Sequence, residues 1–257
     1  MVNKQMFDLS SKVALVTAGG HGLGREYCIA MAEFGADVAC SDIRMDLAQE
    51  TVELLKIYGQ RAIAIQADVS KPEEVERMVN QTVSEFGTID ILFCNAGISI
   101  LNSLHKMSIE DWNRIIAVNL TGTFLCIRTV LPIMLKQKQG SIVCTSSVAG
   151  LWAGSFPNNG PYGATKAGII ALVRHAAIAY AKDGIRINAI APGLHDTRSF
   201  ILPFEEWDKV EDMMRPLIPM GRAGAPSEIK GLAVYLASDA SSYVTGQTFV
   251  QDGGLIA

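Results

Sequence analysis

The stretch YGATK, residues 162–166, places a phenol and an amine where they could act together in proton transfer. Tyr162 and Lys166 are four residues apart, so on a helix they share one face. A free tyrosine has a pKa of about 10 and is a poor base at neutral pH, but a nearby ammonium group favours its phenolate form. Lowering this pKa by roughly 3 units requires about 4 kcal/mol of differential interaction. The pair is therefore a candidate acid–base site that needs a second positive charge.

A glycine cluster, TAGGHGLG at residues 17–24, is the second candidate. It joins the apolar run KVALVT to a segment with a helical apolar stripe, so it connects a strand to a helix. Glycines there allow a tight turn, and the helix N-terminus offers free N–H groups to a phosphate. Asp42 ends the next strand candidate, where a carboxylate can accept hydrogen bonds from ribose hydroxyls. By themselves, these two features fit an empty turn as well as a dinucleotide site.

Strand-like and helix-like segments alternate along the chain. The strand candidates are 12–17, 37–42, 62–67, 89–94, 141–146, 186–191 and 248–252, and the helix candidates lie near 23–34, 46–58, 73–86, 109–137, 162–182 and 226–238. The strands are nearly continuous hydrophobic runs, as expected where helices cover both faces of a parallel sheet. The pattern predicts an α/β fold, a doubly wound parallel sheet in one domain over residues 1–257. Pro132 should kink or end its helix, and residues 194–220 are irregular.

Composition excludes several classes of protein. Hydrophobic residues make up 49% and charged residues 19% of the 257 residues, a globular balance, and the net charge is −4. No long basic run indicates nucleic-acid binding, and no stretch approaches the roughly 20 apolar residues of a membrane span. The N-terminus lacks the apolar core of a signal peptide. The five cysteines lie in apolar elements without C-x-x-C spacing, so we expect no metal site, no disulfides and a cytoplasmic protein.

Further motifs extend these observations over the whole chain. They are FCNAG (93–97), VNLTGTF (118–124), TSSVAG (145–150), INAIAPG (187–193) and SSYVTGQTFVQDGG (241–254). Together with YGATK and the glycine loop, they resemble the short-chain dehydrogenase/reductase family in order and approximate spacing. The resemblance implies a Rossmann-like fold, a nicotinamide dinucleotide cofactor, and a catalytic group of Asn119, Ser147, Tyr162 and Lys166.

The resemblance also implies a role for each catalytic residue. Tyr162 removes the alcohol proton while a hydride passes to the nicotinamide, and reduction is the reverse. The positive charge of the oxidised ring adds to that of Lys166, which also holds the ribose hydroxyls. Ser147 fixes the substrate oxygen, and Asn119 helps to hold a water in a proton relay. The alternatives are a surface pair on a helix, a helix cap at Ser147 and a turn asparagine at position 119.

The cofactor contacts carried over from the family fall on several loops. They are Gly20, His21, Gly22, Leu23, Gly24, Asp42, Ile43, Asp68, Val69, Asn95, Ala96, Gly97, Tyr162, Lys166, Pro192, Gly193, His195 and Thr197. Asp42 would repel the 2′-phosphate of NADP while binding the free ribose hydroxyls of NAD. Arg44 could shield or bind that phosphate, and His21 occupies a position where some relatives carry a basic group. We favour NAD over NADP.

The sequence departs from the family pattern in four places. Ala18 replaces the first glycine of the loop, and we expect Gly19 and Gly20 to share the demands of the turn. His195 stands where a branched aliphatic residue usually faces the nicotinamide. The loop 150–161 is longer than usual, and the usual VDGG appears as VQDGG. These departures concern the detailed geometry of the cofactor site and the substrate pocket.

The lid, residues 194–220, indicates the class of substrate. Its bulky apolar residues are Phe200, Ile201, Leu202, Phe204, Trp207, Met213 and Met214, with Trp152 joining from the longer loop. Either they pack the lid onto the body, or they face a hydrophobic or cyclic secondary alcohol or ketone. Asn158 and Asn159 leave a sugar or polyol substrate open. An NADPH-dependent carbonyl or 3-oxoacyl thioester reductase is the main alternative, and a non-catalytic nucleotide sensor is the least favoured. Relatives imply a homotetramer.

Overall fold

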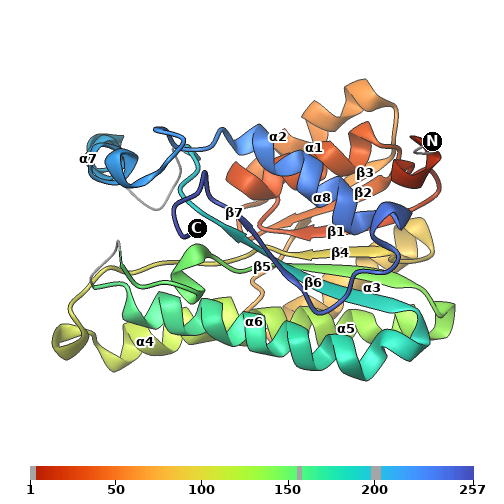
Figure 1. Ribbon diagram of the computed structural model, residues 1–257. Helices are drawn as coiled ribbons and strands as arrows, with labels where there is room; N and C mark the ends of the chain where they lie inside the picture. Colours follow the sequence, from red (N-terminus) through yellow and green to blue (C-terminus); the bar gives the residue numbers. More distant parts are fainter. Residues whose placement is uncertain (1–3, 155–157, 198–203) are drawn as a thin grey trace.

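Seven parallel strands form one sheet in the order β3-β2-β1-β4-β5-β6-β7 (Figure 1). They are β1 (Val13–Thr17), β2 (Asp37–Asp42), β3 (Ala62–Gln66), β4 (Ile91–Cys94), β5 (Gly140–Thr145), β6 (Ile185–Pro192) and β7 (Thr248–Gln251). The computed structural model describes residues 4–154, 158–197 and 204–257. The strand order reverses between β1 and β4, which is the switch point of a doubly wound sheet. The predicted fold class is confirmed.

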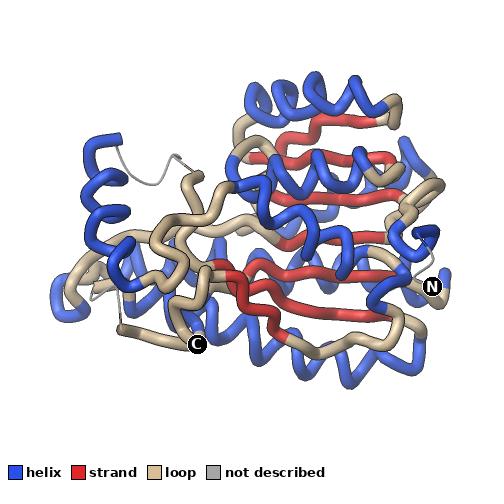
Figure 2. Tube along the Cα trace, turned by 45° about the horizontal axis from the view of Figure 1, so that its top comes forward, coloured by secondary structure: helices blue, strands red, loops and turns tan. Residues whose placement is uncertain are grey.

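Helices cover both faces of the sheet, and Figure 2 shows the strands side by side as one layer. One face carries α1 (Gly22–Glu33), α2 (Met45–Leu55) and α8 (Lys230–Ala237), and the other carries α3 (Pro72–Phe86), α4 (Ile109–Ile115), α5 (Gly122–Gln137) and α6 (Gly160–Tyr180). Each strand contributes side chains to both layers. In β1, Ala14 and Val16 pack on the side of α1, whereas Leu15 packs on the side of α5. This is why the strands are nearly continuous hydrophobic runs.

The helix expected over residues 109–137 is interrupted. A π-helical segment, Ile116–Thr121, separates α4 from α5. Pro132 lies inside α5 and does not end it, and a kink at this residue stays a prediction. A π turn contains an extra residue and is common at functional sites. The segment contains Asn119, one of the predicted catalytic residues.

The run Ile109–Gln137 also corrects the expectation about apolar stretches. Within the described residues it is the one helix long and apolar enough to cross a membrane. Half of its most apolar window is buried inside the fold, where α5 packs on β4, β5 and α3. Its hydrophobicity therefore has an explanation in the core of this domain.

The irregular segment 194–220 contains a helix that periodicity did not separate from its surroundings. This is α7, Phe204–Met214, followed by a short 3-10 turn at Arg215–Leu217. Figure 1 shows α7 beyond the carboxyl edge of the sheet. The lid is therefore a helix set over the edge at which α/β folds bind their ligands.

Candidate active site

A cavity of about 800 Å³ lies at the carboxyl edge of the sheet. The predicted site residues that line it are His21, Gly22, Leu23, Asn95, Gly97, Ser147, Tyr162, Lys166, Pro192, Gly193, His195 and Thr197. Gly20, Gly24, Asp42, Ile43, Asp68, Val69, Ala96 and Asn119 do not line it, and they lie in the glycine loop and α1, at or after the ends of β2, β3 and β4, and in the π-helical segment. The fold thus brings both motifs of the sequence, the glycine loop and YGATK, into one hollow.

Tyr162 and Lys166 lie one turn apart at the start of α6. The Lys166 ammonium is 5.4 Å from the centroid of the Tyr162 ring and donates a hydrogen bond to the Thr145 carbonyl at 2.7 Å. Lys166 is buried, with 3% of its surface exposed. The end of β5 is tied to the same helix, since the Ser146 hydroxyl donates to the Lys166 carbonyl at 2.8 Å. The amine is therefore fixed in place by the strand that carries Ser147.

Burial moves the two pKa values in opposite directions. It raises the pKa of Tyr162, and a hydrogen bond with the Ser147 side chain partly opposes that rise. Burial lowers the pKa of Lys166 to about 8. Both shifts favour the uncharged form, as expected for groups removed from water. Tyr162 therefore needs an additional positive charge in the cavity to act as a base at neutral pH.

Ser147 follows β5 and adopts an extended backbone. Its hydroxyl accepts a hydrogen bond from the Ala149 backbone N–H at 3.1 Å, which caps a short 3-10 turn, Val148–Gly150. The sequence also allowed Ser147 to act as a helix cap, and this contact is such a cap. It leaves the hydroxyl proton available, and the hydrogen bond with Tyr162 joins the two side chains in the cavity.

Asn119 connects two loops behind the cavity. Its side chain accepts from the Ile98 N–H at 2.8 Å and donates to the Ile98 carbonyl at 2.9 Å and to the Thr165 hydroxyl at 3.1 Å. Its own carbonyl accepts from the Thr123 hydroxyl at 2.7 Å. The side chain thus fixes the segment after β4 against α6. The water-holding role stays a prediction.

The glycine loop carries its unusual backbone at residues other than those expected. Ala18 itself has a left-handed φ of +49°, and Gly22 has a φ of +54°, while neither Gly19 nor Gly20 is left-handed. Gly19 and Gly20 therefore share the steric demands of the turn, as expected, but not its left-handed backbone. Neither position has room for a side chain. A Cβ at Gly20, for example, would lie 2.6 Å from the Leu47 Cβ.

Gly24 marks the close packing of the loop on its own helix. A Cβ there would lie 1.9 Å from the Ala18 carbonyl oxygen and 2.6 Å from the Asn95 amide nitrogen. That amide donates to the Ala18 carbonyl at 3.2 Å, and the Asn95 N–H bonds the Thr17 hydroxyl at 2.9 Å. Thr17 thereby ties the ends of β1 and β4 together at the switch point of the sheet.

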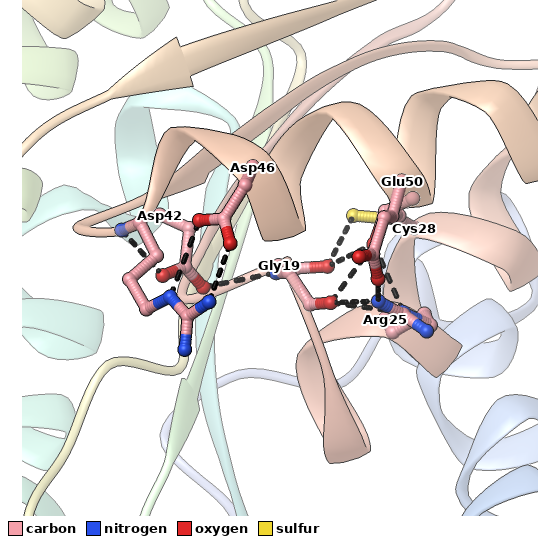
Figure 3. Close-up of polar contacts among 9 residues, drawn as sticks. Gly19, Arg25, Cys28, Asp42, Asp46 and Glu50 are labelled. Carbon is pink, nitrogen blue, oxygen red and sulfur yellow. Dashed lines mark hydrogen bonds and ion pairs between the residues drawn. The ribbon is translucent and has the colours of Figure 1, made fainter. Parts of the chain in front are cut away.

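Asp42 lies against the glycine loop at the end of β2 (Figure 3). One carboxylate oxygen accepts from the Gly20 N–H at 3.0 Å and the other from the Arg44 N–H at 3.0 Å. The Arg44 guanidinium pairs with Asp46 on α2, Nε to Oδ1 being 3.2 Å. Asp42 is buried, so its charge is held at the loop.

The sequence did not predict that Arg25 and Thr51 bind the glycine loop. The Arg25 Nε donates to the Gly20 carbonyl at 2.9 Å and to the Thr51 hydroxyl at 3.0 Å (Figure 3). Thr51 donates in turn to the Gly19 carbonyl at 3.0 Å, and Arg25 pairs with Glu50. Arg25 and Thr51 come from different helices, so no sequence spacing could have revealed this contact.

The remaining predicted cofactor residues lie along the same edge. The Asp68 carboxylate accepts from the Ser70 N–H and hydroxyl at 2.9 and 2.7 Å, and Val69 is buried against Gly122. Ile43 is 60% exposed beside the loop. Asp68 therefore shapes the turn before α3, and a role toward adenine stays a prediction.

His195 is buried beneath the segment that follows β6. Its Nδ1 is 3.2 Å from the Gly193 carbonyl, and its backbone forms a bridge to Gly224. Burial lowers its pKa, so the ring is neutral at physiological pH. Thr197, farther along the segment, lies against the glycine loop, since a Cβ at Gly22 would be 3.5 Å from the Thr197 Cβ.

Apolar side chains surround the far part of the cavity. They are Ile98, Leu101, Val148, Leu151, Trp152, Leu194, Val210, Met214 and Leu255. Met214 is fully buried, while Met213 is 53% exposed, so the two lid methionines face different ways. Phe200, Ile201 and Leu202 lie outside the described residues, as do the side chains of Phe204 and Trp207. Asn158 does not line the cavity, but Asn159 does.

Known proteins resemble this chain along nearly all its length. A family profile described as enoyl-(acyl carrier protein) reductase matches residues 17–256. A 3-oxoacyl-(acyl-carrier-protein) reductase of Staphylococcus epidermidis is 40% identical over 95% of this chain and 99% of its own. A cyclohexanol dehydrogenase of an Acinetobacter species is 39% identical over 95% and 94%. The crystal structure of a short-chain type dehydrogenase/reductase from Mycobacterium marinum has a TM-score of 0.94 at 36% identity, over 98% of each chain.

Proposed function

The chain belongs to the short-chain dehydrogenase/reductase family, and from this premise we propose that it is an NAD-dependent dehydrogenase of hydrophobic, cyclic secondary alcohols, acting in reverse as a ketone reductase. Family membership makes the protein an oxidoreductase that uses a nicotinamide cofactor. The observation that carries the proposal is the shared cavity, in which Ser147, Tyr162 and Lys166 meet an apolar wall.

The residues of the glycine loop fit a dinucleotide. His21 precedes α1 and makes no side-chain cap, so no side chain of that residue competes for the first N–H groups of this 12-residue helix. Uncapped N–H groups and the helix dipole favour a phosphate at this place. The loop residues Ala18, His21, Gly22 and Leu23 line the same cavity as Lys166. When bound, the nicotinamide accepts or supplies the hydride.

The catalytic side chains would divide the proton chemistry among them. Ser147 donates a hydrogen bond to the substrate oxygen, beside the Tyr162 hydroxyl with which it already interacts. In oxidation Tyr162 takes the hydroxyl proton as the carbinol carbon loses its hydride, and in reduction it returns that proton to the oxygen. Lys166 favours the phenolate whenever its amine is protonated. Asn119 keeps the loop at Ile98 in place around this group.

The charges near the ribose site support NAD as the cofactor. Asp42 is buried and aimed at the glycine loop by bonds from Gly20 and Arg44. The Arg44 guanidinium is engaged by Asp46, which places a second carboxylate close to the first. Because Asp46 offsets the Arg44 charge, Asp42 leaves a net negative charge that a 2′-phosphate would approach, whereas two ribose hydroxyls would find an acceptor.

The relatives also support a second candidate, a 3-oxoacyl thioester reductase using NADPH. One of the similar proteins bears that activity in its name, 3-oxoacyl-(acyl-carrier-protein) reductase, at 40% identity. Another is named as a cyclohexanol dehydrogenase at nearly the same identity, 39%. Identity therefore does not separate the two candidates. The apolar wall and the position of Asp42 favour the cyclic alcohol and NAD.

One assay distinguishes the candidates. Purified protein is supplied with cyclohexanol or a small polyol and either NAD or NADP, and with an acetoacetyl thioester and either NADH or NADPH, while the absorbance of the reduced nicotinamide is recorded. We expect turnover of cyclohexanol with NAD to exceed every other combination. Turnover of the thioester with NADPH alone would select the second candidate. Turnover of small polyols without turnover of cyclohexanol would contradict the proposal that the substrate is hydrophobic.

We further propose a homotetramer. Trp112, Phe124 and Ile178 are 37%, 47% and 80% exposed on α4, α5 and α6, which lie in the segments 109–137 and 162–182 through which members of the family usually assemble. Light scattering after gel filtration tests this proposal, and a monomeric mass would contradict it. A cytoplasmic location stays a prediction.

A further inference from the structure

We infer that Asn159 selects substrates that carry a second hydrogen-bond-accepting oxygen in addition to the reacting one. The inference rests on the proposed function, because it concerns the substrate of the same cavity. Asn159 immediately precedes α6, three residues before Tyr162, and both side chains line the cavity with Ser147. Residues three apart at a helix start lie on one side, separated by about 4.5 Å along the axis. A ring bound at Tyr162 therefore extends past Asn159.

The Asn159 side chain does not form the capping hydrogen bond that its position before a helix suggests. Asparagine before a helix usually accepts a hydrogen bond from the first turn. Here it makes no such cap. Its Oδ1 accepts instead from the Ser99 hydroxyl at 2.9 Å, across the cavity rim. The carboxamide is consequently turned toward the segment after β4.

The backbone around Asn159 is held in the same direction. Asn158 has a left-handed φ of +77°, which turns the chain sharply before α6. The Asn158 carbonyl accepts from the Asn102 N–H at 3.0 Å, and the Asn159 carbonyl accepts from the Gly163 N–H at 3.0 Å. Three contacts thus fix residues 158–159 between the loop 99–102 and α6. The orientation of the carboxamide is set before a substrate arrives.

The Nδ2 group of Asn159 is left as a donor. With Oδ1 bound to Ser99, the part of the chain that the structure describes supplies no acceptor to Nδ2. The cavity lining also includes Leu101, Leu151 and Trp152, whose side chains offer no oxygen acceptor. Asn159 is half-buried and Nδ2 is not among the fully buried side-chain atoms that lack a partner, so this group is open to solvent. A ligand that excludes solvent here must supply an acceptor, because a buried donor without one is unfavourable. An oxygen across the substrate ring from the reacting carbon would provide that pairing.

This arrangement defines a class of substrate: a hydrophobic ring with a ketone or alcohol at Tyr162 and a carbonyl oxygen at Asn159. A plain cyclic ketone fills the apolar wall but leaves Nδ2 without an acceptor. Sites that pair a buried polar group with a substrate reject analogues that lack the partner. We therefore expect 1,4-cyclohexanedione to be preferred over cyclohexanone by about tenfold or more, which corresponds to about 1.4 kcal/mol.

The test compares the two ketones in variants of the protein. The ratio of kcat/KM for 1,4-cyclohexanedione to that for cyclohexanone is measured with NADH. In Asn159→Leu this ratio should fall to about the twofold value that two equivalent carbonyls give by number alone. Asn159→Asp keeps the shape but presents only acceptors, and the ratio should fall further. Asn102→Leu changes a neighbouring asparagine that does not line the cavity and should keep the wild-type ratio.

A variant at position 99 tests the inference even if the variants at position 159 do not fold. Ser99→Ala removes the hydroxyl that holds Oδ1, so the ratio should fall partway while the α6 start is unaltered. A wild-type ratio near two, or an unchanged ratio in Asn159→Leu and Ser99→Ala, would overturn the inference about Asn159 alone. Turnover of neither ketone with either cofactor would overturn the proposed function, and this inference with it.

Discussion

At the glycine-loop end of the site, polar groups are bonded mainly to one another, whereas at the substrate end they line the cavity. Asp42 and Arg25 bind the Gly20 N–H and carbonyl, so the loop is held by the protein itself. At the other end, Tyr162 and Asn159 each have one serine partner, Ser147 and Ser99, and line a cavity with many apolar residues. The difference suggests that the cofactor end is rigid before binding, while the substrate end gains its hydrogen bonds from what it binds.

Removing the Tyr162 hydroxyl should have the largest effect. Tyr162→Phe deletes the proton donor and acceptor of the substrate end, and kcat should fall by about 10²–10⁴-fold. NADH binding should change far less, because the glycine loop and Lys166 are intact. Steady-state kinetics and a fluorescence titration with NADH measure the two effects. Near-normal turnover in this variant would show that the proton chemistry lies elsewhere.

Neutralising Asp42 tests the cofactor end. Asp42→Asn removes a buried negative charge beside Gly20, so the ratio of kcat/KM for NADP to that for NAD should rise by about 10- to 100-fold, or about 1.4–2.7 kcal/mol. Asp37→Asn, at the opposite end of β2, is the matched control and should leave the ratio unchanged. An equal shift in both variants would mean that net charge, and not the position of Asp42, sets the preference.

The buried Lys166 makes stability depend on pH. Its pKa is about 8 in the folded protein and 10.5 in the unfolded chain, so between these values the unfolded chain binds the extra proton. The free energy of unfolding should therefore gain up to about 1.4 kcal/mol per pH unit from this group as pH rises above 8. Denaturation of cofactor-free protein at pH 7.5–9.5 measures this contribution. Lys166→Met should reduce the slope, and identical slopes would contradict the burial of a titrating amine.

The strained backbone at Ala18 should have the smallest effect. A left-handed φ of +49° costs an alanine about 1–2 kcal/mol, which a glycine avoids at some cost in chain entropy. Ala18→Gly should therefore stabilise the protein by about 0.5–1 kcal/mol. Ala14→Gly, inside β1, lacks the strain and should destabilise it by a similar amount. Thermal unfolding of both variants settles the sign.

The parts that could be predicted from the sequence are those with local causes. The apolar pattern predicts the strand before the glycine loop and the helix after it. It also predicts that Asp42 lies at the end of the next strand. The i, i+4 spacing of Tyr162 and Lys166 needs only a helix. The fold class and the gathering of the motifs at one edge follow from these patterns.

The parts that could not be predicted depend on contacts between distant segments. The left-handed φ falls on Ala18, while Cys40, Leu47 and Asp42 leave no room for a Cβ at Gly19 or Gly20. Arg25 of α1 and Thr51 of α2 meet at the loop. Such arrangements are set by packing, which leaves no periodic trace in the chain.

The number of residues in the π-helical segment Ile116–Thr121 sets the direction of the Asn119 side chain, and so it matters to the site. An α-helix advances about 100° per residue, so one residue fewer in this segment would let α4 wind directly into α5 and turn Asn119 by that angle. Its carboxamide would then lose Ile98 and Thr165 together, although no side chain had been changed. A shortening by one codon at this point would separate the loop after β4 from α6 as surely as replacing the asparagine.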